Sequence, residues 1–168
     1  DYNTAHLIDV LRGFKLKYPH LHLILEPGSA FVWQTGFLYA RVIDIVNNHG
    51  VNTAILNVSF ACHMPDCLEM PYKPLIRGAS MPDQDLYPYK YDLGGNSCLA
   101  GDNLGFWTFP RPLKPGDSLI FEDMIHYTVF KSHTFNGVAH PAICFLRKDN
   151  KLEIWREYTY SDYKHRMD

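Results

Sequence analysis

The chain has 168 residues, of which 46% are hydrophobic, 20% charged and 14% aromatic, and its formal net charge is −2. This composition is that of an ordinary globular protein, and the absence of a basic run argues against nucleic-acid binding. No apolar stretch reaches the roughly 20 residues that a membrane-spanning helix needs. The four cysteines lack the regular spacing of a secreted disulfide scaffold, so we expect reduced thiols and a cytoplasmic protein.

The first part of the chain has the pattern of one helix–strand unit. After the polar pair Asn3-Thr4, which offers a helix cap, apolar residues recur with helical spacing at Leu7, Ile8, Leu11 and Phe14. An apolar run at residues 21–25 then predicts a buried parallel strand. One such unit cannot cover both faces of its own strand. We therefore expect the chain to be a fragment of a longer α/β protein.

The predicted strand stops at the sequence Glu26-Pro27-Gly28-Ser29. In α/β folds, an acid at the carboxyl end of a parallel strand points into the ligand crevice. Pro27 fixes its own φ angle, and Gly28 allows a close backbone approach. The same residues also suit an ordinary strand-ending turn with a solvated glutamate. The pattern alone leaves both interpretations open.

From residue 37 onward the sequence predicts short strands separated by glycine and proline. Residues 37–46 and 51–58 flank a turn rich in Asn and Gly, which is typical of a hairpin. A short helix is expected at residues 161–167. Because no helical period separates the strands, the pattern predicts an antiparallel sandwich or barrel. Further strands are predicted at residues 74–79, 89–93, 105–109, 117–121, 142–147 and 152–158.

Three polar clusters in the β-rich part could carry chemistry. Residues 62–67 contain Cys, His and Asp, but their spacing matches no structural zinc pattern. A second cluster places Cys98 and Asp102 in a glycine-bracketed loop, where a thiol can approach a ligand, although a buried inert cysteine is equally compatible. The third cluster, His126 and Tyr127, also suits a satisfied core pair.

Together these stretches resemble a known family, the carboxynorspermidine/carboxyspermidine decarboxylases, which belong to the fold-type III pyridoxal-phosphate decarboxylases. The motifs HMPD, CLAGD and IHYT match this branch, whereas EPG and a loop cysteine alone match only the wider group. The resemblance covers nearly the whole chain. Its segments are LEPGSAFVWQTG at residues 25–36, HMPD at 63–66, GNSCLAGD at 95–102 and IHYTVFKSHTFNG at 125–137.

The resemblance implies a mainly β chain with some α structure. Residues 37–168 would form the C-terminal β-sandwich or barrel domain, and residues 1–36 the last helix–strand unit of a (β/α)8 barrel. The implied activity is the pyridoxal 5'-phosphate-dependent decarboxylation of carboxynorspermidine or carboxyspermidine to norspermidine or spermidine. The family assembles as a homodimer with active sites at the interface. Its cofactor-binding lysine and phosphate loop precede this segment, so we expect the 168 residues alone to be inactive.

The resemblance also assigns roles to residues that match the family motifs. Glu26 would hold the proton on the cofactor's pyridine nitrogen. Gly28 would lie near the cofactor phosphate, and Tyr127 would donate its hydroxyl to that phosphate. Cys98, which reaches in from the partner subunit, would deliver a proton to the substrate carbon after CO2 has left. Each role suits the chemistry of its side chain.

Three further residues are implied to contact the substrate. Asp66 and Asp102 match acidic positions suited to the ammonium groups of a polyamine-like tail, which are costly to bury without a partner. Ser29 stands where several family members have a second acid. Either Ser29 substitutes by hydrogen bonding or the tail is held differently. No metal is implied by these motifs.

Several alternatives remain open from the sequence. One is a decarboxylase of another basic amino acid, such as diaminopimelate, ornithine or arginine. A non-catalytic β assembly module predicts instead that Cys98, Asp66 and Tyr127 are buried and far apart. The decarboxylase hypothesis predicts that Glu26 and Tyr127 face one cavity. It also predicts that Cys98 lies with Asp102 on an exposed loop. A cupin-like metal enzyme requires at least three of four side chains to converge: His63, Asp66, His126 and His133.

Overall fold

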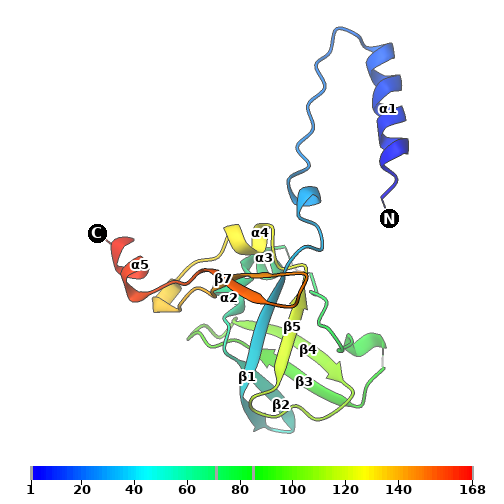
Figure 1. Ribbon diagram of the computed structural model, residues 1–168. Helices are drawn as coiled ribbons and strands as arrows, with labels where there is room; N and C mark the ends of the chain where they lie inside the picture. The colour runs from blue at the N-terminus through cyan, green and yellow to red at the C-terminus, as the bar shows by residue number, and fades with distance from the viewer. Residues whose placement is uncertain (1, 71, 85, 168) are drawn as a thin grey trace. The chain divides into compact units, whose positions relative to one another are not determined.

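The structure, a computed structural model, describes residues 2–70, 72–84 and 86–167 (Figure 1). The chain divides into two compact units, Asp1–Phe31 and Val32–Asp168. The second unit contains all the strands and the hydrophobic core. Each unit is described by itself.

The first unit consists of helix α1 (Thr4–Lys17) and the segment that follows it, as far as the 3-10 turn η1 (Gly28–Phe31). The Asn3 side chain caps the helix by accepting a hydrogen bond from the His6 backbone N–H at 3.0 Å. The predicted helix and its cap are confirmed. None of the α1 residues is buried. Neither α1 nor any other helix within the described residues is long and apolar enough to cross a membrane.

The strand predicted at residues 21–25 is wrong for this structure. These residues have no regular secondary structure, and Ile24 is 80% exposed. A β-strand requires a neighbour that accepts and donates its backbone hydrogen bonds. No strand within the described residues pairs with this segment. An apolar run thus has the composition of a strand here without a sheet to join.

The second unit is built on a five-stranded sheet with the order β4-β3-β2-β1-β5 (Figure 1). The turn between β1 and β2 has positive φ angles at His49 and Gly50, the conformation of a type I′ hairpin turn, which confirms the predicted hairpin. The predicted strands at 89–93, 105–109 and 117–121 are also confirmed. The bounds are β1 Phe37–Asn48, β2 Val51–Leu56, β3 Tyr89–Gly94, β4 Asn103–Phe109 and β5 Ser118–Glu122.

Strand β1 is long and belongs to two successive strand pairings. Its first part, from Phe37 to Arg41, pairs with β5, and its second part, from Val42 to Asn48, pairs with β2. A register shift between Val42 and Asp44 separates the two parts. Such a β-bulge bends a strand and increases its twist. The sheet therefore curls around its own core.

The segment predicted as a strand at residues 74–79 forms no regular strand. It contains one isolated β-bridge, and Ser80, directly after it, forms a second. Ile76 pairs with Phe121 in β5, and Ser80 pairs with Thr108 in β4. These partners lie in the two edge strands of the sheet, so the segment connects both edges. The curled sheet is thereby closed in the manner of a barrel.

The expected purely antiparallel order is wrong at one position. Strands β2 and β3 run parallel, with Thr53 opposite Asp92 and Ile55 opposite Gly94. A parallel pair requires a crossover connection, which cannot be a tight hairpin turn. The intervening residues supply it and include helices α2 (Phe60–His63) and α3 (Pro65–Glu69), where the sequence predicted no helix. Helices this short show no periodicity in a sequence.

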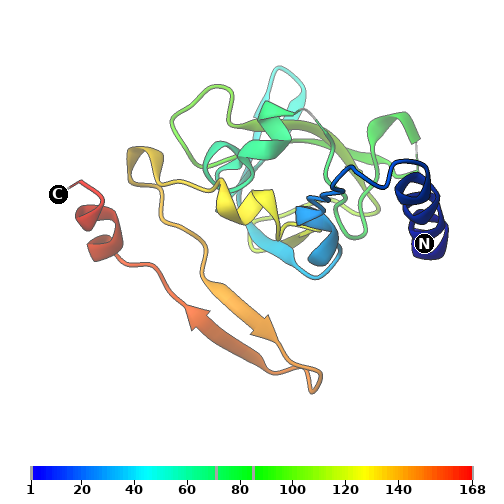
Figure 2. The ribbon, with the colours of Figure 1, turned by 90° about the horizontal axis from the view of Figure 1, so that it is seen from above.

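Helix α4 (Tyr127–Phe130), also not predicted, lies with α2 and α3 at one end of the curled sheet (Figure 1). The chain then forms a hairpin of β6 (Ile143–Leu146) and β7 (Leu152–Arg156), which pair only with each other (Figure 2). Helix α5 (Tyr160–His165) ends the described chain and confirms the predicted C-terminal helix. A capping box formed by Thr159 and Asp162 begins this helix.

The core fills the inside of the curled sheet. Phe60 of α2 packs edge-on against Phe121 of β5 with ring centroids 6.0 Å apart, and both side chains are 0% exposed. Leu56 and Leu93 are equally inaccessible, and Trp107 is 1% exposed. Helix α2 is therefore part of the core.

We expect Phe121→Ala to lower the free energy of unfolding by about 3–5 kcal/mol, because it leaves a cavity beside Phe60. Urea denaturation measures this change. Phe130→Ala is the matched control, since Phe130 is 89% exposed, and it should change stability by less than about 0.5 kcal/mol. Equal losses in both variants would contradict the assigned core.

Candidate functional site

The turn at Glu26 lies in the first unit. The Gly28 backbone N–H donates to the Glu26 carbonyl oxygen at 2.9 Å, and the chain continues into η1. The Glu26 carboxylate is exposed and has no hydrogen-bond partner among the described residues. Ser29 lies in the same turn and is half-buried. The other predicted site residues, Asp66, Cys98, Asp102 and Tyr127, belong to the second unit.

Asp66, in α3, is 2% exposed and holds two hydroxyl groups through one carboxylate oxygen. Its Oδ2 accepts hydrogen bonds from the Tyr72 hydroxyl at 2.6 Å and from Thr128 Oγ1 at 3.1 Å. Burial, followed by the hydrogen bond to Asp66, raises the pKa of Tyr72. The second oxygen, Oδ1, is buried without a partner among the described residues. Because Thr128 directly follows Tyr127, Asp66 fastens the helix that begins with Tyr127.

Tyr127 is the first residue of α4 and is 54% exposed. The His126 ring lies edge-on to the Tyr127 ring at 6.0 Å, and His126 Nε2 lies 3.6 Å from Asp123 Oδ2. Asp123 Oδ1 in turn accepts a hydrogen bond from the Gln34 backbone N–H at 2.7 Å. The Tyr127 hydroxyl itself has no partner in the part of the chain that the structure describes. It is therefore an available donor on a well-supported helix.

The loop at residues 95–102 carries an exposed Cys98 and a buried Asp102, which is 4% exposed. Asp102 Oδ1 accepts a hydrogen bond from the Ala61 backbone N–H at 2.9 Å, and Oδ2 accepts one from the Ser97 backbone N–H at 3.0 Å. Burial acts to raise the pKa of Asp102, but hydrogen bonds from Ser97 and from the Ala61 backbone outweigh it, and the pKa is lowered. The carboxylate thus stays charged and is engaged by its own chain.

These placements correct one expectation. The exposure of Cys98 is confirmed, but the expectation that Asp102 also lies on an exposed loop is wrong. Two backbone N–H groups near the core require an acceptor, and Asp102 supplies it. The assembly-module hypothesis expected Cys98, Asp66 and Tyr127 all to be buried, and only Asp66 is.

His63 connects helix α2 to a distant segment of the chain. Its Nδ1 accepts a hydrogen bond from the Ser59 backbone N–H at 3.1 Å, so the ring proton lies on Nε2, which donates to the Ala139 carbonyl at 2.9 Å. Desolvation by burial lowers the pKa of His63 to about 4. His63 is therefore neutral at physiological pH and acts as a structural clamp.

The convergence that a metal enzyme requires is not found within the described residues. No group of three His, Cys, Asp or Glu side chains in that part of the chain could hold a metal ion. Both ring nitrogens of His63 are occupied by backbone groups, which removes it as a ligand.

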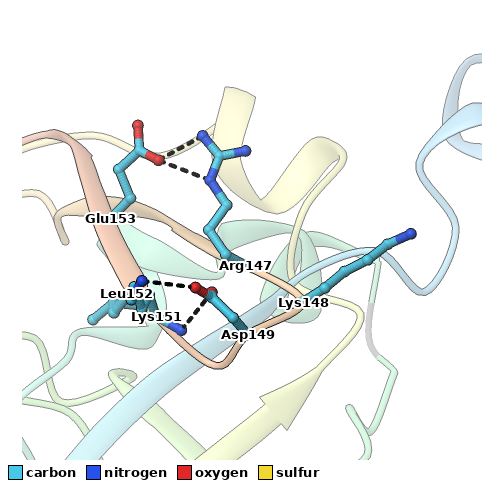
Figure 3. Close-up of a pocket in the computed structure, with 6 residues that line it drawn as sticks. All are labelled: Arg147, Lys148, Asp149, Lys151, Leu152 and Glu153. Atoms are coloured by element: carbon cyan, nitrogen blue, oxygen red, sulfur yellow. Dashed lines mark hydrogen bonds and ion pairs between the residues drawn. The ribbon is translucent and has the colours of Figure 1, made fainter.

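A surface hollow lies at the turn between β6 and β7, and four of its charged side chains form two pairs (Figure 3). Arg147 Nε binds the Glu153 carboxylate at 2.7 Å, and Lys151 Nζ binds Asp149 at 3.0 Å. None of the predicted site residues lines it. Lys148 also lines the hollow and has no partner among the residues drawn, but a lone surface lysine does not make a candidate active site.

Sequence reasoning gave no role to Asn136, which contacts the predicted catalytic cysteine. The Asn136 side-chain Nδ2 lies 2.8 Å from Cys98 Sγ. Asn136 has a φ angle of 54° and is followed by Gly137 with a φ angle of 75°. The Asn-Gly pair is a sequence signal for such a left-handed turn, but it does not reveal which side chain the turn presents to Cys98.

Residues 8–125 match the family model described as "Pyridoxal-dependent decarboxylase, C-terminal sheet domain". The chain therefore belongs to the pyridoxal-dependent decarboxylases and contains their C-terminal sheet domain, as its motifs indicated.

Two named relatives and one solved structure make the comparison more specific. The chain is 52% identical over 166 residues to carboxyaminopropylagmatine decarboxylase of Synechocystis sp., covering 99% of this chain and 42% of the relative. It is 40% identical over 171 residues to carboxynorspermidine/carboxyspermidine decarboxylase of Campylobacter jejuni, covering 96% of this chain and 44% of the relative.

The crystal structure of carboxynorspermidine decarboxylase from C. jejuni, complexed with norspermidine, superposes with a TM-score of 0.86 at 40% identity. The superposition covers 98% of this chain and 47% of that one. Diaminopimelate decarboxylase from M. jannaschii shares the fold, with a TM-score of 0.69 at 20% identity. The chain thus spans less than half of the length of these relatives.

We expect acid to destabilise the second unit through His63. Its folded pKa of about 4 lies below the unfolded value of 6.5, so the unfolded state binds the proton first. Stability is then lost as the pH falls from 6.5 towards 4, by about 3 kcal/mol in total. Urea denaturation at several pH values measures this slope. His63→Gln should flatten the slope, whereas exposed His49→Asn should retain it; an unchanged slope in His63→Gln would contradict the assignment.

A second expectation concerns the space around Asp102. A Cβ atom on Gly95 would overlap the Asp102 carboxylate, whereas one on Gly101, in the same loop, would meet nothing within 4 Å. We expect Gly95→Ala to lower the free energy of unfolding by about 1–3 kcal/mol, since it displaces a buried acceptor from its donors. Gly101→Ala should be nearly neutral. Denaturant titration of both variants provides the test, and comparable stability would show that Asp102 does not organise the loop.

Proposed function

We propose that the full-length protein containing this chain is a pyridoxal 5'-phosphate-dependent decarboxylase of carboxylated polyamines, with this chain as its C-terminal part. The proposal draws support from relatives of that class at 40% and 52% identity and from the similarity to a decarboxylase solved with norspermidine. Residues 1–36 would complete the barrel domain, and residues 37–168 would form the β-domain. The cofactor lysine would lie in the part of the protein outside this chain.

The observation that carries the proposal is that some polar side chains at the motif positions have hydrogen-bond partners within the chain, whereas others have none among the described residues. Asp102 and His63 have their hydrogen-bonding groups engaged by the chain. Glu26, Cys98 and Tyr127 are exposed, and the Glu26 carboxylate and Tyr127 hydroxyl have no partner among the described residues. Groups of that kind are available to a ligand.

These groups fit pyridoxal phosphate. The Tyr127 hydroxyl is a donor suited to a phosphate oxygen, and Gly28, which has no side chain, would allow the cofactor phosphate a close approach to the backbone. A carboxylate such as Glu26 holds a proton on a pyridine nitrogen. When bound, the cofactor takes up the electron pair released as the carboxyl carbon leaves. Cys98 would then supply a proton to the substrate carbon from the partner subunit of a homodimer.

For the substrate, Asp66 and Asp102 differ in what they can contribute. Asp66 has one carboxylate oxygen without a partner among the described residues, which suits an ammonium group of the polyamine tail. Both oxygens of Asp102 are engaged, so we assign it to holding the Cys98 loop. The Ser29 hydroxyl would contact the same tail. We place the enzyme in the cytoplasm on the basis of its cysteine usage.

A second candidate substrate is carboxyaminopropylagmatine, which names the relative at 52% identity. Carboxynorspermidine and carboxyspermidine end in an ammonium group, whereas an agmatine moiety ends in a guanidinium group. A carboxylate can pair with either cation, and a guanidinium can bind it in bidentate fashion. The residues of this chain therefore suit all three compounds, and an activity assay with each compound identifies the substrate.

The test uses the full-length protein. We expect a bound-cofactor absorption band and CO2 release from at least one of carboxynorspermidine, carboxyspermidine and carboxyaminopropylagmatine, with diaminopimelate and ornithine as comparison substrates. Tyr127→Phe should weaken pyridoxal-phosphate affinity by roughly tenfold or more, because it removes a hydrogen bond to a charged group. Titration of the cofactor-free protein with pyridoxal phosphate measures this affinity.

Tyr160→Phe is the matched control, since Tyr160 is 76% exposed and lies in α5. It should leave the affinity unchanged. Absence of cofactor binding in the full-length protein would overturn the proposed function. Efficient turnover of diaminopimelate or ornithine alone would retain the cofactor but reject the polyamine substrate class.

A further inference from the structure

The structure places one side chain directly on the exposed thiol of the Gly-bracketed loop. Asn136 Nδ2 lies 2.8 Å from Cys98 Sγ, although the two residues are separated by 38 positions in the sequence. Among the described cysteines, Cys62 and Cys67 are buried and Cys144 is intermediate, so Cys98 is the exposed one. The contact therefore links the one exposed thiol of the described chain to a neutral amide donor.

Asn136 is held by an unusual backbone conformation. Its φ angle of 54° lies in the left-handed region, where asparagine is tolerated and most side chains are strained. The Gly137 N–H donates to the Thr134 carbonyl at 3.0 Å, and the Val138 N–H donates to the Phe135 carbonyl at 3.2 Å. These hydrogen bonds hold the turn that contains Asn136, and so set the direction in which its Cβ atom projects.

Both partners of the contact are anchored to the same buried helix. On one side, the Asp102 carboxylate joins the Ser97 N–H of the cysteine loop to the Ala61 N–H of α2. On the other side, the His133 N–H donates to the Cys62 carbonyl at 2.9 Å, and His63 holds Ala139. Helix α2 thus anchors both the loop at residues 95–102 and the segment at residues 133–139. This shared anchor restrains the distance between Cys98 and Asn136.

We propose that Asn136 is a positioning residue for Cys98 in the decarboxylation reaction, and this rests on the proposed function. Cys98 would break its S–H bond and give the proton to the substrate carbon that has lost CO2, whose electron pair forms the new C–H bond. The negative charge then lies on sulfur. The Asn136 N–H donates to that sulfur, which stabilises the thiolate until solvent returns a proton. Asn136 also holds the thiol in a single orientation, which shortens the search for reactive geometry.

Two substitutions separate the donor from the backbone. Asn136→Asp keeps the size and the tolerance for a left-handed backbone, but replaces the N–H donor by a charged acceptor. Asn136→Gly keeps the backbone and removes the side chain. Asn150 provides a matched control, since it also has a positive φ angle, 63°, and lies in the turn between β6 and β7, which contains none of the predicted site residues.

The first measurement is the alkylation of Cys98 by iodoacetamide in the full-length protein, with the modified cysteine identified by peptide mass spectrometry. Asn136→Asp should slow alkylation at Cys98 at least threefold, because a carboxylate disfavours the thiolate that reacts. Asn150→Asp should leave the rate unchanged. A rate in Asn136→Asp equal to or faster than the wild-type rate overturns the proposal, whether or not the protein proves to be a decarboxylase.

The second measurement is a double-mutant cycle on decarboxylation. Asn136→Gly should lower kcat by about tenfold with KM within twofold, whereas combining it with Cys98→Ala should lower kcat no further than Cys98→Ala alone. A structural role would instead lower kcat in both backgrounds, and such multiplying losses overturn the proposal. If no substrate is decarboxylated at all, the proposed function fails, and the alkylation rates still decide whether Asn136 acts on Cys98.

Discussion

The buried Asp102 carboxylate is the interaction on which the arrangement of the candidate site depends. It bridges the Ala61 N–H of α2 and the Ser97 N–H of the cysteine loop. A buried carboxylate is stable only when hydrogen bonds replace its lost water, and the two backbone groups supply them. The same bonds satisfy amides that would otherwise be unpaired. The Asp102 carboxylate therefore pairs two backbone N–H groups, which in turn stabilise its own charge. The same hydrogen bonds connect the loop of the exposed Cys98 to the core.

A similar logic governs the neighbouring helix, α4. Asp66 accepts a hydrogen bond from Thr128, and the Asp123–His126 pair lies beside Tyr127, whose hydroxyl remains available. In both places a buried carboxylate stabilises the backbone that carries an exposed reactive group. Asp66 and Asp102 were expected to contact a substrate tail, but most of their carboxylate oxygens accept hydrogen bonds from the protein itself. Binding groups on a rigid support lose little entropy when a ligand arrives.

Local patterns predicted most of the strands, the first helix and the last. The type I′ turn at His49-Gly50 and the Asn3 cap depend on a few adjacent residues, so they could be recognised without the fold. The parallel β2–β3 pair, the short helices α2 to α4 and the closure through Ile76 and Ser80 could not, because each depends on contacts between distant residues. The failed strand at residues 21–25 has the same cause, since a strand requires a partner.

The sequence by itself determined the family, through motifs whose order and spacing match the pyridoxal-dependent decarboxylases, and it singled out Cys98 and Tyr127. Only the tertiary structure decided what the acids do and what touches the thiol. Burial converts Asp102 from a candidate ligand group into a bridge between helix α2 and the Cys98 loop, and the left-handed turn brings Asn136 onto Cys98. The physical reason is that burial and hydrogen-bond partners are set by chain segments far apart in sequence, which no local pattern records.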